Sequence, residues 1–244
     1  GTLESLLRLS KALCSIKERE KALETLKAKE PQFGSDFKYL EEISSLCSSL
    51  GRKEEACEAA LKMLRSSSDP QETSRAVTTA ALALKAAGSF DAFRSSLEAK
   101  NPRSVQETCL LAEMQLQTAE AGKALATLDG ALASSQSSLP LLTARLQACR
   151  KAGKTDESIA TLKRIMDSQP NKGSWCLREL AETCLKAGLH SDALSWTEKW
   201  TKSSPGVAAP SLLEARILQD SGDWRKASGI LAKAWRKFPD DREI

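Results

Sequence analysis

Residues Leu177–Pro205 read LRELAETCLKAGLHSDALSWTEKWTKSSP, and this stretch decides the fold. Its first part carries apolar residues three and four positions apart, the spacing of one face of an α-helix: Leu177, Leu180, Ala181, Cys184 and Leu185. Gly188 is expected to end this helix, because glycine tolerates the left-handed backbone that a helix C-terminus often needs. A second helix should follow and stop before Pro205, since proline disfavours helical backbone in its predecessor. The stretch therefore predicts a helical hairpin.

The same pattern recurs along the chain. Six glycines mark the recurrence at intervals of 37, 34, 31, 35 and 34 residues: Gly51, Gly88, Gly122, Gly153, Gly188 and Gly222. In the last three copies a small residue follows the glycine after five positions and a proline after seventeen: Ser158 and Pro170, Ala193 and Pro205, Ala227 and Pro239. A fixed period near 34 residues is typical of an array of helical hairpins.

These residues resemble the tetratricopeptide repeat (TPR) family, whose 34-residue unit places glycine at the turn, alanine in the second helix and proline at the end. The match is good around Gly188 and Gly222 and weaker upstream, where Phe93 replaces the alanine and Ile16-Lys17-Glu18 replaces the turn glycine. The resemblance implies one right-handed all-α solenoid over 1–244, a TPR-like superhelix of stacked antiparallel hairpins. Its seven units are expected at about 3–34, 37–70, 73–102, 104–138, 139–172, 173–206 and 207–240.

Composition agrees with helices and excludes other classes. Val and Ile together supply only ten of the 244 residues, which argues against a sheet. Seven cysteines without a C-x-x-C pair, and the single His190, expected in a turn, support neither a disulfide framework nor a metal site. We therefore predict no enzymatic activity, no cofactor and no metal. The absence of a signal segment or membrane span predicts a cytoplasmic or nuclear protein.

In the TPR family the first helices line a concave groove that holds a peptide or a helix of a partner. The resemblance therefore implies partner-binding residues on the first helices: Lys11, Lys38, Glu41, Arg75, Lys85, Glu113, Gln147, Arg150, Trp175, Arg178, Glu182 and Arg216. This mixed, mildly basic set predicts a protein partner with acidic and apolar side chains. Trp175 and Arg178 are the expected main anchor, because Trp and Arg dominate binding energy in interfaces. The alternative is that Trp175 packs against the preceding hairpin.

The last helix carries an apolar edge that we expect to be exposed: Leu231, Trp235 and Phe238. We expect the natural protein to continue past residue 244, and the alternative is that this edge docks a partner or a second copy. The tryptophans after residue 190 fall on or near packing stripes, which predicts core positions: Trp196, Trp200, Trp224 and Trp235. Cys47, Cys149 and Cys184 are expected to be small apolar fillers.

The alternative function is RNA binding of the pentatricopeptide type, because those proteins also consist of helical hairpins of about 35 residues. Cys184-Leu185-Lys186-Ala187-Gly188 has some likeness to them. The net charge is only +4, and the groove positions carry no sustained basic stripe. Protein binding is therefore the prediction, with no membrane and no nucleic acid among the expected partners.

Overall fold

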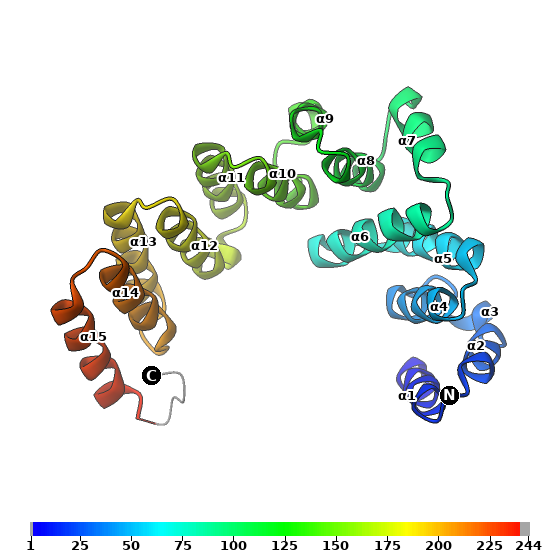
Figure 1. Ribbon diagram of the computed structural model, residues 1–244, viewed down its shortest axis with the longest axis horizontal. Helices are drawn as coiled ribbons and strands as arrows, with labels where there is room; N and C mark the ends of the chain where they lie inside the picture. Colours follow the sequence, from blue (N-terminus) through cyan, green and yellow to red (C-terminus); the bar gives the residue numbers. More distant parts are fainter. Residues whose placement is uncertain (1, 240–244) are drawn as a thin grey trace. The chain divides into compact units, whose positions relative to one another are not determined.

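The computed structural model describes residues 2–239. Over this range the chain forms fifteen α-helices and one short 3₁₀ helix, without a β-strand (Figure 1). The all-α prediction is confirmed. The chain divides into two compact units, which meet in sequence between Ala148 and Cys149 and are described separately.

The first unit consists of four helical hairpins and most of a ninth long helix. Its elements are α1 (Leu3–Ser15), α2 (Arg19–Lys27), the short α3 (Glu30–Phe33), α4 (Phe37–Ser49), α5 (Lys53–Ser66), α6 (Pro70–Ala86), α7 (Phe90–Ala99), α8 (Val105–Gln117), α9 (Ala121–Ser134) and α10 (Leu139–Lys151) up to Ala148. Asp36, Asp69 and Ser104 start three of the first helices, because their side chains accept hydrogen bonds from backbone N–H groups of the first turn.

The second unit continues the same alternation. It contains the last residues of α10, then α11 (Thr155–Ser168), a 3₁₀ turn at Pro170–Lys172, α12 (Gly173–Lys186), α13 (His190–Ser203), α14 (Ala209–Asp220) and α15 (Trp224–Lys237). Within this unit α13 packs against both α12 and α14 (Figure 1). His190 is the first residue of α13 and not part of the turn, so that prediction is wrong.

A left-handed residue precedes every second helix by two positions and fixes the register of the repeats. Five of these residues are the expected glycines: Gly51, Gly88, Gly153, Gly188 and Gly222. The other two are Lys17, with φ 67°, and Ala119, with φ 60°. Gly122 does not lie at the turn but within α9, displaced toward the second helix of its hairpin. The turn of that hairpin is set by Ala119, because this register places the apolar side of α9 against its neighbours.

Packing between successive hairpins buries the eighth residue of the second helices. In the first unit these residues are Leu26, Ala60, Leu97 and Leu128, and in the second unit Leu162 and Thr197, each at most 3% exposed. In the first unit α5 contacts both α4, the first helix of its own hairpin, and α6, the first helix of the next. Each hairpin thus shelters the apolar side of its neighbour, which is the stacking principle of a solenoid.

The burial predicted for the three cysteines is observed, whereas the burial predicted for the tryptophans is observed only in part. Cys47, Cys149 and Cys184 are fully buried, which confirms their assignment as fillers. Trp200 is also buried, whereas Trp224 is 64% and Trp235 62% exposed, so the prediction of core positions is wrong for these two. Both lie on a side of α15 that no helix of the described chain covers.

Candidate functional site

The first unit has a groove on its first helices, referred to below as the unit 1 groove. It is a depression that opens to solvent. Three successive first helices line it: α6 with Pro70, Thr73, Ser74, Val77 and Thr78, α8 with Cys109, Ala112, Glu113 and Leu116, and α10 with Pro140, Thr143, Ala144 and Gln147. Among the predicted partner-binding residues, the unit 1 groove brings together Glu113 and Gln147.

The unit 1 groove combines polar and apolar groups. Hydroxyl groups come from α6 and α10, apolar side chains come mainly from Val77 and Leu116, and Glu113 carries the one charge. The Glu113 carboxylate accepts a hydrogen bond of 3.1 Å from the Gln117 amide. Burial raises the pKa of the Cys109 thiol to about 12, so this sulfur stays protonated at neutral pH. The lining can therefore exchange hydrogen bonds and bury small apolar groups.

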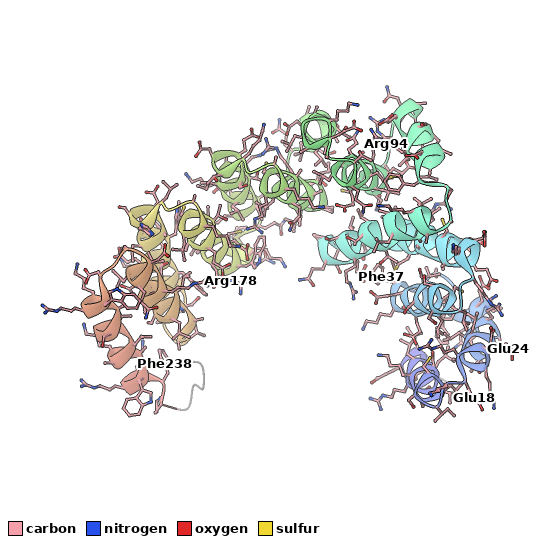
Figure 2. All side chains as sticks on the ribbon, in the orientation of Figure 1. Glu18, Glu24, Phe37, Arg94, Arg178 and Phe238 are labelled. Carbon is pink, nitrogen blue, oxygen red and sulfur yellow. The ribbon has the colours of Figure 1, made fainter. Side chains whose placement is uncertain are left out.

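Arg75 and Glu41, both predicted to bind a partner, bind each other. The Arg75 Nη1 atom lies 3.1 Å from Glu41 Oε1, joining α6 to α4. The Arg75 guanidinium also lies 5.0 Å from the centroid of the Phe37 ring (Figure 2). A cation over an aromatic face is held in place by the ring's electrons. Arg75 therefore has a structural role between two hairpins.

Three further lysines of the predicted set belong to the first unit and lie on α1, α4 and α6: Lys11, Lys38 and Lys85. All three are exposed, and none forms an ion pair with another described residue. Their positive charges are therefore not neutralised by an ion pair within the described residues.

In the second unit the predicted residues gather around Glu179 of α12. Its carboxylate lies 2.5 Å from Arg150 Nη2 and 3.2 Å from Arg178 Nη2, and its side chain is only 12% exposed. Arg178 also approaches Glu182 at 3.8 Å. Trp175 is half-buried on the same helix. Glu179 is not among the residues predicted from the sequence, although its position next to Arg178 is a signal for the pairing.

Carboxylates therefore neutralise much of the positive charge that the sequence placed on the first helices. Arg75, Arg150 and Arg178 each have an acidic partner. Arg216 of α14 is exposed and forms no ion pair with the described residues. Among the predicted partner-binding cations, Arg216 and the three lysines of the first unit are those without an ion pair to a described residue.

The predicted edge of the last helix is largely a surface feature. Leu231 and Phe238 are half-buried, and Trp235 is exposed. Six residues of α14 and α15 line an open groove there: Gln219, Trp224, Ser228, Leu231, Ala232 and Trp235. Phe238 lies beyond this groove, where the Lys237 ammonium sits 5.1 Å from its ring centroid (Figure 2). Trp224 belongs to the exposed edge, although its place near the packing stripe predicts a core position.

Comparison with known proteins identifies the fold. No family model matches the sequence, and no curated protein matches it either. Among solved structures, PilW, a widely conserved type IV pilus biogenesis factor, is 17% identical and matches 98% of this chain and 95% of its own with a TM-score of 0.52. A TPR protein from Parabacteroides merdae is 18% identical, with coverages of 96% and 92% and a TM-score of 0.48. The chain has a TPR-like helical-repeat fold, as the sequence predicts.

Membrane-spanning helices and metal-binding clusters are both absent from the described residues. Between residues 2 and 239 there is no helix with the length and apolar content of a membrane span. The same residues contain no cluster of three or more His, Cys, Asp or Glu side chains able to hold a metal ion.

Proposed function

We propose that this protein is a non-enzymatic interaction scaffold that binds a peptide or a helix of a partner protein on its first helices. The unit 1 groove is the observation that carries the proposal. Three first helices contribute hydroxyl groups, an amide and apolar side chains to a single depression. A peptide backbone needs both donors and acceptors. The Thr78 and Thr143 hydroxyl groups donate to carbonyls of their own helices and so offer acceptor lone pairs, whereas the Gln147 amide offers both a donor and an acceptor.

The first helices of the second unit support the proposal through different chemistry. Trp175 offers a half-buried aromatic surface, and the nearby Arg178 retains a side chain that is 46% exposed. Trp and Arg at the centre of an interface contribute most of its binding energy. The unpaired Arg216 favours a partner that carries acidic as well as apolar side chains. Seven free cysteines are consistent with a reducing compartment, so we place this activity in the cytosol or nucleus.

Selection of peptides from a random display library on residues 1–244 tests the proposal. Binding of the selected peptides is then measured with a Thr78→Arg/Gln147→Arg variant and with a Trp175→Ala/Arg178→Ala variant. We expect at least a tenfold loss of affinity in one of them, because the first blocks the unit 1 groove and the second removes the anchor. Ala126→Arg on the exposed side of α9 is the control and should bind normally.

Two results would contradict the proposed function. Selected peptides that bind both double variants as tightly as the unmodified chain would show that the first helices are not the binding surface. Tight binding of random single-stranded RNA with a steep dependence on salt would favour the pentatricopeptide-type alternative.

A further inference from the structure

The last second helix partly exposes its eighth residue, a position that the other second helices bury. We define the α15 face by the first, fifth, eighth and twelfth residues of that helix: Trp224, Ser228, Leu231 and Trp235. The eighth residue is at most 3% exposed in the six preceding second helices, but Leu231 is only half-buried. Trp224 and Trp235, at the two ends of the face, are 64% and 62% exposed.

In the second unit the covering element of this face is always a first helix. His190, the first residue of α13, has its Nε2 atom 2.8 Å from Asp220 Oδ2 on α14. Leu194, the fifth residue, packs against a cluster that contains Ala215 and Leu218 of the same helix. The α15 face is therefore the place where another α-helix would lie.

The next hairpin upstream gives the same result independently. Ile159 and Met166 are the fifth and twelfth residues of α11, and both pack against the cluster to which Leu177 and Ala181 of α12 contribute. The first and fifth positions of the α15 face thus correspond to contacts of α13, and the fifth and twelfth positions correspond to contacts of α11. By analogy with the α13–α14 and α11–α12 contacts, the molecule that covers the α15 face should be an α-helix. That helix should present an apolar stripe to the face.

The positive charge of α15 indicates which side chains the bound helix should carry. Helix α15 carries five cations and no carboxylate: Arg225, Lys226, Lys233, Arg236 and Lys237. Lys226 is paired with Asp223 at 2.6 Å, and Lys237 donates to the Pro205 carbonyl at 2.9 Å. Arg225 and Arg236 each follow a tryptophan of the α15 face by one position, and neither forms an ion pair with a described residue. Carboxylates beside the apolar stripe of the bound helix could form ion pairs with these two guanidinium groups.

We propose that the α15 face binds an amphipathic α-helix of a partner protein that carries carboxylates beside its apolar stripe. A second copy of the chain fits less well. The helix with an exposed edge in the first unit is α1, where Leu9 is 48% exposed, but α1 carries Arg8 and Lys11 against the single Glu4. An excess of positive charge on both surfaces opposes such a dimer. The proposal does not depend on the function proposed for the unit 1 groove.

Helix α14 covers the corresponding face of α13, so its sequence is the starting point for a peptide that tests the α15 face. It is a fluorescent peptide with the sequence of residues 208–221, which contains α14, in which Arg216→Glu raises the number of carboxylates to three. A side-chain staple keeps it helical, since an isolated helix of this length is marginal in water. In the reversed peptide Lys replaces Glu214, Arg216 and Asp220. Fluorescence anisotropy with residues 1–244 gives both dissociation constants.

We expect the acidic peptide to bind at least tenfold more tightly than the reversed one. Trp224→Ala/Trp235→Ala should weaken the acidic peptide at least tenfold, and so should Arg225→Glu/Arg236→Glu. These four side chains are exposed, so the variants should keep the far-ultraviolet circular dichroism of the unmodified chain. Leu82→Ala, at a residue 57% exposed, is the matched apolar control and should change nothing. The matched charge control is Lys53→Glu/Arg65→Glu.

Several results would overturn the proposal. Absence of binding, equal binding of the two peptides, or insensitivity to the tryptophan variant would each exclude an acidic helix on the α15 face. If sedimentation shows a dimer that the tryptophan variant abolishes while the peptide does not bind, the occupant is a second copy. If a longer form of the chain, with residues after Ile244, does not bind the acidic peptide, the occupant is the segment that follows Ile244. Binding to vesicles of phosphatidylcholine and phosphatidylserine without peptide binding would instead assign the face to a lipid surface.

Discussion

The hydroxyl group of Tyr39 donates a hydrogen bond of 2.9 Å to the backbone carbonyl oxygen of Leu26. This bond joins the second helix of one hairpin to the first helix of the next, at the position where hairpins stack. Tyr39 is 2% exposed, and the Leu26 side chain is fully buried. The contact therefore reports directly on whether two neighbouring repeats are packed.

The ionisation of Tyr39 should follow this burial. Desolvation, with a smaller effect of Glu30, raises the pKa of Tyr39 to about 12. Because the folded-state pKa lies above the unfolded value near 10, the hydroxyl stabilises the fold below pH 10, and this contribution is lost as the pH rises toward 12. Absorbance at 295 nm measures the ionisation cleanly, since the chain has one tyrosine. A midpoint near 10 in the folded protein would contradict the packing.

Removing the Tyr39 hydroxyl group should lower the free energy of unfolding by a small but measurable amount. The Leu26 carbonyl also accepts a hydrogen bond of 2.8 Å from the Lys29 N–H, so Tyr39→Phe does not leave it without a donor. We expect the free energy of unfolding in urea to fall by about 1 kcal/mol. The difference between the variant and the unmodified chain should shrink between pH 10 and 12. Equal stability at pH 7 would show that the bond contributes nothing.

Substitutions at the turns test the register of the repeats. Ala119 holds a left-handed backbone, so Ala119→Gly should raise the free energy of unfolding by about 0.5 to 1 kcal/mol. Gly188→Ala should lower it by about 1 kcal/mol for the opposite reason. Gly122→Ala should be stabilising by up to about 1 kcal/mol, because Gly122 is helical and an added Cβ would meet no neighbour within 4 Å. Destabilisation by Gly122→Ala would restore Gly122 as the turn residue.

The sequence predicts the hairpins because their signals are local. A stripe of apolar residues, a glycine and a proline lie within one repeat, and each acts on the backbone of its immediate neighbours. Ala119 and Lys17 break this rule, since neither residue type favours the left-handed conformation. At these two turns the packing of the flanking helices, including the burial of Leu26 and Leu128, outweighs the local preference.

The candidate site was predicted less well, because it depends on contacts between distant parts of the sequence. Glu41 and Arg75 are 34 residues apart in the sequence, and the residues next to either of them do not predict the ion pair. The exposure of Trp224 and Trp235 depends on the neighbours of α15 rather than on the pattern within it. A periodic sequence reveals which side of a helix is apolar but not whether that side is covered.

The Arg94 side chain links α7 to the turn between α8 and α9 (Figure 2). Its guanidinium donates to Glu98 at 3.0 Å, to Thr118 at 2.9 Å and to Glu120 at 2.7 Å, and its side chain is 14% exposed. Leu97 is the one buried residue that α7 contributes. Polar contacts therefore hold this short helix, and Arg94→Ala should lower the free energy of unfolding by about 1 to 2 kcal/mol.

The same variant should change the titration of Glu120. Hydrogen bonds from Lys123 and Arg94 lower the pKa of Glu120 to about 2. The stabilising effect of its charge is present above the unfolded pKa near 4 and is lost as the pH falls toward 2. Carboxyl resonances in nuclear magnetic resonance spectra should place the Glu120 midpoint higher in Arg94→Ala. An unchanged midpoint would show that Lys123 alone sets the pKa. Arg8→Ala, at an exposed i,i+4 pair of α1, serves as the control.

One of the seven thiols should be alkylated much faster than the other six. Burial raises the pKa of Cys109 to about 12 and that of Cys176 to about 11, and it also raises the pKa values of Cys47, Cys57 and Cys184. Cys149 is fully buried, whereas Cys14 is partly exposed on α1. Iodoacetamide reacts with the thiolate, so at pH 8 Cys14 should be alkylated at least tenfold faster than the others. Mass spectrometry of proteolytic peptides measures each rate. Cys14→Ser should remove the fast phase, and a fast phase that persists in this variant would mean that a repeat opens far more readily than its packing implies.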